Sequence, residues 1–278
     1  MTRTTAHDSP RPAVAMTIAG GDPGGGAGLQ ADLKTFAAHR VHGFSVITAV
    51  IAQNSVRVAR VAPVAPALVA AQIATLVAER RPDALKTGAL ADAAIVRAVA
   101  RSIARFDLPA PIVDPVMLST SGARLLDRAG ERALVKSIFP LARLVTPNRQ
   151  EAEALSGIAI DSPLAMRAAA HAIHRLGPRA VLIKGGHPPR ADNSSAPRRL
   201  VDLLFDGRAF VEFSVPRVPG AGAHGTGCAF AAAIAAGLAR GLALEEAIRA
   251  AQRYLGRALR AAYRLSPAGR PILDHGVR

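Results

Sequence analysis

Short apolar runs alternate along this chain with longer segments in which apolar residues recur every three or four positions. The runs are typical of strands buried on both faces, and the longer segments are typical of amphipathic helices. This alternation predicts an α/β fold, in which a mostly parallel sheet is covered by helices on both faces. The predicted strands are residues 13–19, 45–53, 84–88, 111–117, 143–146 and 180–184. The predicted helices are residues 29–38, 65–79, 92–105, 128–139, 150–155, 163–176, 227–239 and 244–263.

The pattern changes towards the C-terminal end of the chain. Residues 188–199 are polar and are expected to form a loop, and residues 200–218 are predicted to form a hairpin that turns at Asp206 and Gly207. A length of 278 residues suits one large α/β domain. The expected organisation is a flexible N-terminal tail over residues 1–12, a single domain over 13–265 and a C-terminal tail over 266–278.

Composition excludes several classes of protein. Half of the residues (50%) are apolar, which is enough for an extensive core and excludes global disorder. The single cysteine, Cys228, excludes a disulfide framework and a cysteine-based zinc cluster. No apolar run reaches the ~18 residues of a membrane span, and residues 1–12 lack the apolar core of a secretory signal. We therefore expect a protein of the reducing cytoplasm that has no membrane partner.

The formal net charge of +15 raises the question of a nucleic-acid partner. Almost all of this charge comes from Arg residues that are spread along the whole chain. No basic patch is interleaved with aromatic residues that could stack on bases, so we expect no nucleic-acid partner. One helix face, typical of a solvated surface, would carry Arg249, Arg253, Arg257, Arg260 and Arg264. Lysine is rare, and three of the few Lys residues fall in segments with candidate chemistry: Lys34, Lys86 and Lys184.

A glycine-rich segment follows the first predicted strand. Residues 20–28 contain six glycines, which allow the backbone to approach a ligand and to direct N–H groups towards it. The helix that follows carries Asp32 and Lys34 near its start. A flexible linker is the alternative, but linkers rarely lie between a buried strand and the start of a helix. We therefore interpret residues 20–28 as a ligand-binding loop.

A second glycine-rich segment, residues 220–228, leads into a helix of very small residues. It matches the dinucleotide-binding pattern G-x-G-x-x-G, but it follows a predicted hairpin and lacks the acidic residue that this fingerprint requires. The N–H groups at the helix start instead predict an anion-binding site at Gly225, Thr226, Gly227 and Cys228. At this position the pKa of the Cys228 thiol is expected to be lowered, and a small buried core residue is the alternative role.

Charged residues follow three further predicted strands. Asp114 ends one strand, Asn148 and Glu151 follow the next, and Lys184 closes a third. The carboxyl ends of parallel strands meet at one edge of a sheet, so we expect these side chains to lie beside the anion site. Carboxylates in such a place can hold Mg²⁺ near phosphates, although each could instead be a helix cap or an exposed loop acid. Neither Lys-Thr pair of the chain completes a P-loop, which excludes a Walker-type nucleotide site.

Seven segments, in order along the chain, are TIAGGDPGGGAGLQADLKTF (17–36), TAVIAQNS (48–55), KTGAL (86–90), VDPVM (113–117), TPNRQEAEAL (146–155), LIKGGH (182–187) and HGTGC (224–228). With these segments the chain resembles the ribokinase-like vitamin kinases, and within them the hydroxymethylpyrimidine/phosphomethylpyrimidine kinases of thiamine biosynthesis. The resemblance runs from about residue 14 to residue 259. So many ordered matches argue against chance similarity.

The resemblance implies a three-layer α/β/α ribokinase-like fold, ATP as phosphoryl donor, Mg²⁺ and a small pyrimidine as substrate. The residues that it implies around the pyrimidine are Gly20, Asp32, Gln53 and Val116. A Gln amide can pair with an aminopyrimidine edge through both its donor and its acceptor. The resemblance also implies Lys184 and Thr226 on the ATP phosphates, Asp114 and Glu151 near Mg²⁺, and the amides of Gly225–Cys228 on the transferred phosphoryl group. Cys228 stands where many relatives in the wider superfamily carry an Asp base.

The implied activity is ATP-dependent phosphorylation of 4-amino-5-hydroxymethyl-2-methylpyrimidine and then of its monophosphate. A pyridoxal or pyridoxine kinase is the alternative within the class, and a non-catalytic ligand-binding protein or a nucleic-acid-binding protein is the alternative outside it. Two positions depart from the family pattern, because Ala89 stands where Met is usual and Thr120 where many relatives have Lys. Relatives are often dimers, so the resemblance also implies a possible homodimer.

Overall fold

The computed structural model describes residues 11–119, 121–185, 199–218 and 222–277, which form a nine-stranded sheet. The strand order is β3-β2-β1-β4-β5-β6-β7-β8-β9. The six neighbouring strands β2, β1, β4, β5, β6 and β7 pair in parallel. Strand β3 pairs antiparallel with β2 at one edge, and β8 and β9 pair antiparallel at the other. The strands are β1 (Val14–Gly20), β2 (His42–Gln53), β3 (Val58–Pro63), β4 (Ala84–Thr87), β5 (Ile112–Val113), β6 (Leu144–Val145), β7 (Val181–Ile183), β8 (Arg199–Phe205) and β9 (Phe210–Pro216).

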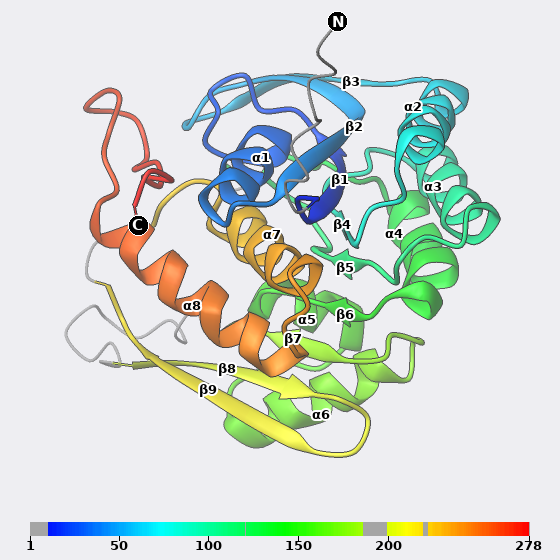
Figure 1. Ribbon diagram of the computed structural model, residues 1–278. Coiled ribbons are helices and arrows are strands. Elements are labelled where there is room, and N and C mark those ends of the chain that lie inside the picture. The colour runs from blue at the N-terminus through cyan, green and yellow to red at the C-terminus, as the bar shows by residue number, and fades with distance from the viewer. Residues whose placement is uncertain (1–10, 120, 186–198, 219–221, 278) are drawn as a thin grey trace, which may run out of the picture.

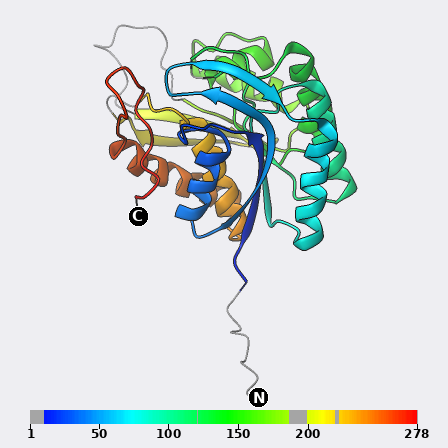
Figure 2. The same ribbon diagram turned by 90° about the horizontal axis from the view of Figure 1, so that it is seen from above.

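Helices cover both faces of this sheet (Figure 1). One layer holds α1 (Gly28–Ala38), α7 (Thr226–Ala239) and α8 (Leu244–Arg260). The other holds α2 (Pro66–Glu79), α3 (Ala93–Arg105), α4 (Arg128–Ala133), α5 (Arg149–Ser156) and α6 (Pro163–His174). The view from above separates the two layers (Figure 2). The predicted α/β/α fold with a mostly parallel sheet is therefore confirmed.

Alternate residues of the central strands supply the cores of the two layers. On β1, Met16 and Ile18 face the core under α2, α3 and α6, whereas Ala15 faces the core under α1, α7 and α8. Both sets are fully buried, which is why the strand is apolar except at Thr17, which is buried as well. Helix α7 is buried from Ala229 to Gly237, and its small side chains let it lie close to β1, β4 and β5. Among the described residues, every helix is too short or too polar to cross a membrane.

Most predicted elements are present, with three differences. Strand β3 was not predicted, because its side chains are largely exposed and its strand form comes from pairing with β2. The predicted helix 128–139 is regular only as far as Ala133 and continues as a π-helical turn, Leu134–Ile138. The expected C-terminal tail is packed over its described residues, and Ile272 and Leu273 are 4% and 1% exposed. Ile272 pairs with His224 and Tyr263, and Leu273 packs in a cluster with Ala229 of α7 and Ala258 of α8.

The strand order reverses direction at β1. The chain leaves β1 to form β2 on one side, and it later places β4 on the other side of β1. Loops at the carboxyl ends of β1 and β4 therefore diverge, and such a switch point is the usual ligand site of an open α/β sheet. The glycine loop, residues 20–28, begins at this point, at the end of β1.

Candidate active site

The glycine loop is organised by its one carboxylate. The Asp22 side chain is buried and accepts hydrogen bonds from the N–H groups of Gly24, Gly26 and Ala27, at 3.0, 3.1 and 2.8 Å. The loop then enters α1 through Gly28, whose φ is +57° and where a Cβ would lie 2.5 Å from the Gly20 carbonyl oxygen. The loop therefore has a defined shape and is not a flexible linker.

The anion-binding turn is held directly against this loop. Gly225 precedes α7 with φ of +81°, and a Cβ there would lie 1.8 Å from the carbonyl oxygen of Gly26. No side chain fits between the two backbones. The Thr226 hydroxyl donates to the carbonyl of Ala223 at 2.7 Å, which closes the turn. The structure thus brings together the two glycine-rich segments, which lie about two hundred residues apart in the sequence.

A buried ion pair lies at the base of the site. Nζ of Lys86 donates to Oδ2 of Asp32 at 2.7 Å, and the Thr17 hydroxyl donates to the same oxygen at 2.6 Å. Both charged side chains are 0% exposed. The other carboxylate oxygen of Asp32, Oδ1, is buried and has no hydrogen-bond partner among the described residues. It therefore keeps an accepting site for a ligand.

The expected lowering of the Cys228 pKa is wrong. Burial raises the pKa of this thiol to about 12, and the charges of Asp114 and Asp32 raise it further. The charge of Lys86 and the backbone N–H of Gly28 act in the opposite direction but do not outweigh burial. The start of a helix favours a thiolate only where desolvation is small, and here the thiol is protonated at neutral pH.

Two carboxylates and one cation meet beside the start of α7. Nζ of Lys184 lies 3.2 Å from Oδ1 of Asp114, whose side chain is 3% exposed. Burial raises the pKa of Glu151 to about 7, the charge of Lys184 opposes this shift, and the charge of Asp114 adds to it. A Cβ at Gly227 would lie 3.3 Å from Nζ of Lys184 and 3.6 Å from Oδ2 of Asp114. The predicted phosphate and metal residues thus lie around the predicted anion hole.

Glu151 has a structural partner as well. Its carboxylate accepts from the N–H of Asn148 at 2.8 Å, while the Asn148 side chain accepts from the N–H of Glu151 at 2.9 Å. This reciprocal pair is a capping box at the start of α5. The alternative role as a helix cap is therefore correct for Glu151, and the charges of Lys184 and Asp114 also act on its carboxyl.

An apolar wall lies on the other side of the glycine loop. Ala49 and Ile51 of β2 form a small cluster with partly buried Ala89 and Val116. A Cβ at Gly20 would lie 2.9 Å from Cδ1 of Ile51. Gln53 ends β2 beyond this wall and is partly buried. The predicted substrate residues thus come from four segments. Gly20 and Gln53 end β1 and β2, Asp32 lies within α1, and Val116 lies in the segment after β5.

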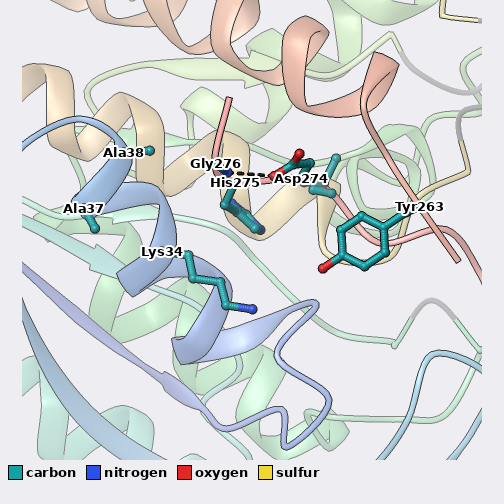
Figure 3. Close-up of a pocket in the computed structure, with 8 residues that line it drawn as sticks. Lys34, Ala37, Ala38, Tyr263, Asp274, His275 and Gly276 are labelled. Atoms are coloured by element: carbon teal, nitrogen blue, oxygen red, sulfur yellow. Dashed lines mark hydrogen bonds between the residues drawn. The ribbon is translucent and has the colours of Figure 1, made fainter. Parts of the chain in front are cut away.

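Some sequence motifs fall elsewhere. Thr120, His187 and residues 220–221 lie outside the described residues. Lys34 is exposed and donates to the carbonyl of Gly25 at 2.7 Å, so it supports the loop from outside. It also lines a cavity of about 360 Å³ between α1 and the C-terminal segment (Figure 3).

Sequence reasoning missed one supporting carboxylate. Asp202 of β8 accepts from the N–H of Gly185 at 2.9 Å and from the side chain of Gln252 at 2.8 Å. It therefore holds the segment directly after Lys184. The available signal was an Asp between apolar residues of a predicted strand, since a buried acid needs partners.

A comparison with family models matches residues 22–272 to the family described as phosphomethylpyrimidine kinase. The hydroxymethylpyrimidine/phosphomethylpyrimidine kinase of Synechococcus elongatus is 44% identical over 259 residues, which cover 93% of this chain and 96% of that protein. The thiamine biosynthesis bifunctional protein ThiED of Geobacter sulfurreducens is 45% identical over 257 residues. That match covers 92% of this chain, which spans about half (51%) of the bifunctional protein.

Solved structures give a related result. The ADP complex of Bacillus subtilis pyridoxal kinase superposes with a TM-score of 0.84 and 34% identity, over 95% of this chain and 98% of that chain. The likeness therefore extends over the whole sheet and both helical layers.

Proposed function

The chain belongs to the phosphomethylpyrimidine kinase family, and from this premise we propose that it is the kinase that phosphorylates 4-amino-5-hydroxymethyl-2-methylpyrimidine and then its monophosphate with ATP. The observation that carries the proposal is the contact between the two glycine-rich segments at Gly26 and Gly225. It joins the anion hole at the start of α7 to a loop that borders an apolar wall. The two halves suit a phosphoryl donor and a small aromatic acceptor.

On the acceptor side, three features support a pyrimidine. The apolar wall at Ile51, Ala89 and Val116 suits the face of an aromatic ring. Gln53 offers one donor and one acceptor to an aminopyrimidine edge. Oδ1 of Asp32 is a buried acceptor without a partner among the described residues, and an amino group of the substrate would satisfy it.

On the donor side, charge and helix geometry favour phosphates. The N–H groups of residues 225–228 begin α7 and point out of its positive end. Nζ of Lys184 lies beside Gly227, where it can meet the same anion. Phosphoryl transfer depends mainly on positioning and charge stabilisation, and these groups supply both.

The oxygen ligands of the site fit Mg²⁺. This ion is usually held by one or two carboxylates together with the phosphates of a nucleotide. Asp114 and Glu151 are two such carboxylates, and the pKa of Glu151 is raised by burial first and by the charge of Asp114 second. Among the described residues no group of three or more His, Cys, Asp or Glu gathers as a complete metal site. Bound with ATP, Mg²⁺ would neutralise phosphate charge at these two residues.

Cys228 is our candidate for accepting the proton of the substrate hydroxyl. Its pKa of about 12 means that a thiolate is rare before substrates bind. A protonated thiol cannot take up a further proton, so the step requires a Cys228 thiolate whose own proton has already passed to water. Lys86 is the nearby charge that favours the thiolate form.

The decisive experiment offers the purified protein Mg-ATP with each pyrimidine in turn and measures ADP release. A matched variant, Lys184→Met, removes a charge at the phosphates and leaves the acceptor side intact. We expect turnover with both pyrimidines and a large loss in the variant. The proposed function is refuted if neither of the two pyrimidines leads to ADP release. Ligand binding without turnover would instead support a non-catalytic binding protein. Salt-sensitive binding of DNA or RNA would support a nucleic-acid-binding protein.

A second candidate is phosphorylation of pyridoxal. It is favoured by the similarity to the Bacillus subtilis pyridoxal kinase and by the small side chain of Ala89 on the apolar wall. Values of kcat/KM measured side by side for pyridoxal and the hydroxymethyl pyrimidine decide between the two. We expect the pyrimidine to be preferred, and Ala89→Met to lower the value for pyridoxal more than that for the pyrimidine.

We also propose that two copies of the chain associate. Ile47 and Val50 of β2 are 41% and 64% exposed, and Val56 beyond the strand is 46% exposed. These exposed apolar side chains come from one stretch of the chain, and exposed apolar surface suits an interface. Sedimentation of the wild type and of Val50→Lys tests this, because a dimer that uses this surface should dissociate in the variant.

A further inference from the structure

A buried carboxylate–imidazole pair joins the glycine loop to the start of α7. Oδ2 of Asp22 lies 3.0 Å from Nε2 of His224, and the two side chains are 1% and 8% exposed. Burial raises the pKa of Asp22, but the hydrogen bond and charge of His224 and the amides of Ala27 and Gly24 outweigh it, so the pKa lies below its usual value. An ionised carboxylate only accepts hydrogen bonds, so Nε2 of His224 carries the proton in this contact.

The backbone on both sides of the pair is closely interlocked. A Cβ at Gly26 would lie 2.9 Å from Cδ2 of His224, and a Cβ at Gly225 would lie 1.8 Å from the Gly26 carbonyl oxygen. The C-terminal segment closes the third side, since the N–H of His224 donates to the carbonyl of Pro271 at 2.8 Å. With no room for side chains, the position of the anion hole relative to the loop is set by the Asp22–His224 contact and these close approaches.

Candidate reacting groups lie immediately next to this junction. Gly225 directly follows His224 and begins the anion hole. The N–H of Gly28, the residue directly after the Asp22-bound amide of Ala27, faces the Cys228 thiol. A shift at the junction would therefore move the phosphoryl donor site relative to the acceptor site. Displacements of about 1 Å at such a site can cost about 100-fold in rate.

We infer that Asp22 and His224 are a positioning pair for phosphoryl transfer: they hold the amides of residues 225–228 in register with the acceptor-binding loop. The inference rests on the proposed function. Neither side chain belongs to the candidate substrate, phosphate or metal residues, so the pair acts through the groups that it aligns.

The first test compares variants at the two ends of the Asp22–His224 contact. His224→Gln retains an amide N–H at the reach of Nε2, whereas His224→Asn is too short for it, and Asp22→Asn removes the charge of the acceptor. We expect His224→Gln to keep most of the wild-type kcat. The other two should lose about 10- to 100-fold in kcat, with little change in KM for either substrate. The double variant Asp22→Asn/His224→Asn should lose no more than the worse single variant, because both remove one contact.

A matched control separates alignment from general weakening of the loop. Lys34→Met also removes a hydrogen bond to the glycine loop, the one to Gly25, but it leaves the junction with α7 intact. This variant should retain kcat. If His224→Gln loses as much kcat as His224→Asn, or if the losses follow the melting temperature across all variants, the pair is merely structural and the inference is wrong.

A second readout does not depend on turnover. Cys228 is the one cysteine of the chain, so a thiol reagent reports on this site alone. Asp22→Asn and His224→Asn should change the reaction rate of the thiol, while His224→Gln and Lys34→Met should match the wild type. If the wild type turns over neither pyrimidine, the proposed function fails and the thiol rates still test the junction. Equal thiol rates in all variants would overturn the positioning role.

Discussion

Replacing Lys86 by Met gives the sharpest test of how the base of the site is held. The side chain keeps its length and its apolar stem but loses the ammonium that pairs with Asp32. Both partners are 0% exposed, and Nζ lies 2.7 Å from Oδ2. The Asp32 carboxylate is then left buried with one hydrogen bond, from Thr17. A buried charge that loses its partner destabilises the folded state strongly.

The magnitude follows from this burial. Breaking a buried ion pair by removing one partner costs about 3–5 kcal/mol. For a domain of this size, each kcal/mol lowers the melting temperature by about 2–4 °C, so a fall of roughly 6–20 °C is expected. In the wild type, burial lowers the pKa of Lys86, but the charge of Asp32 outweighs it and the pKa is raised. The Lys86 charge therefore contributes to stability below its usual pKa and is lost only in strong alkali.

The pH dependence of the variant has a definite sign. Without Lys86, burial holds the pKa of Asp32 above its unfolded value, so the folded state binds the proton more tightly. Stability of Lys86→Met relative to the wild type should then rise as the pH falls from 7 towards 4. The reason is that a buried carboxyl whose pKa is raised in the folded state destabilises that state at pH values above the unfolded pKa, where the unfolded chain is already ionised.

The assay is urea unfolding of four proteins near neutral pH and near pH 5. The double variant Asp32→Asn/Lys86→Met replaces both charges and should recover more than half of the lost stability. Lys136→Met, at an exposed position, is the surface control and should change the free energy of unfolding by less than about 0.5 kcal/mol. If Lys86→Met lies within about 1 kcal/mol of the wild type, or if the double variant is no better than the single one, the reasoning is refuted.

Three further predictions concern the turn, the thiol and the C-terminal segment. Gly225→Ala places a Cβ against the Gly26 carbonyl at positive φ, so kcat should fall in steady-state kinetics and the melting temperature should drop in thermal unfolding. Wild-type values of both quantities would contradict the close approach of the two backbones. Cys228→Ser and Cys228→Ala should both lower kcat by about 10²–10⁴ if the thiol accepts the proton, and unchanged turnover would remove it as the base. Burial lowers the pKa of His275 to about 4, so wild-type stability should fall as the pH drops from about 6.5 to 4. The variant His275→Asn, whose amide matches the reach of the Nδ1 that contacts Tyr254, should flatten this dependence in thermal unfolding.

The regular elements could be predicted where their burial pattern is simple. Strand β1 is apolar at all but one position because both of its faces are covered. Helix α3 follows Asp92, whose side chain accepts from two N–H groups at the helix start. Strand β3 lacks such a signal, since its mixed residues become a strand by pairing with β2. Strands β4, β5 and β6 are shorter than predicted, with 4, 2 and 2 residues in the sheet.

The candidate site was predictable in its parts and less so in its electrostatics. Residues at strand ends and helix starts, such as Asp114 and Lys184, were predicted to share one edge of the sheet, and they lie in contact there. The pKa of Cys228 was predicted with the wrong sign. The local effect of a helix start is visible in the sequence, whereas the burial and the carboxylates of Asp32 and Asp114 come from distant segments.

By itself, the sequence determined the layered α/β fold, the place of the two glycine-rich segments and the family, because these depend on periodicity and on short motifs. The tertiary structure decided how those segments meet. The contact between Asp22 and His224 spans 202 residues of chain. The close approach of the Gly225 backbone to the Gly26 carbonyl oxygen depends on backbone positions that no residue pattern encodes. Charge states were decided there too, since a pKa depends on the solvent and charges around a group, and these exist only once the chain has folded.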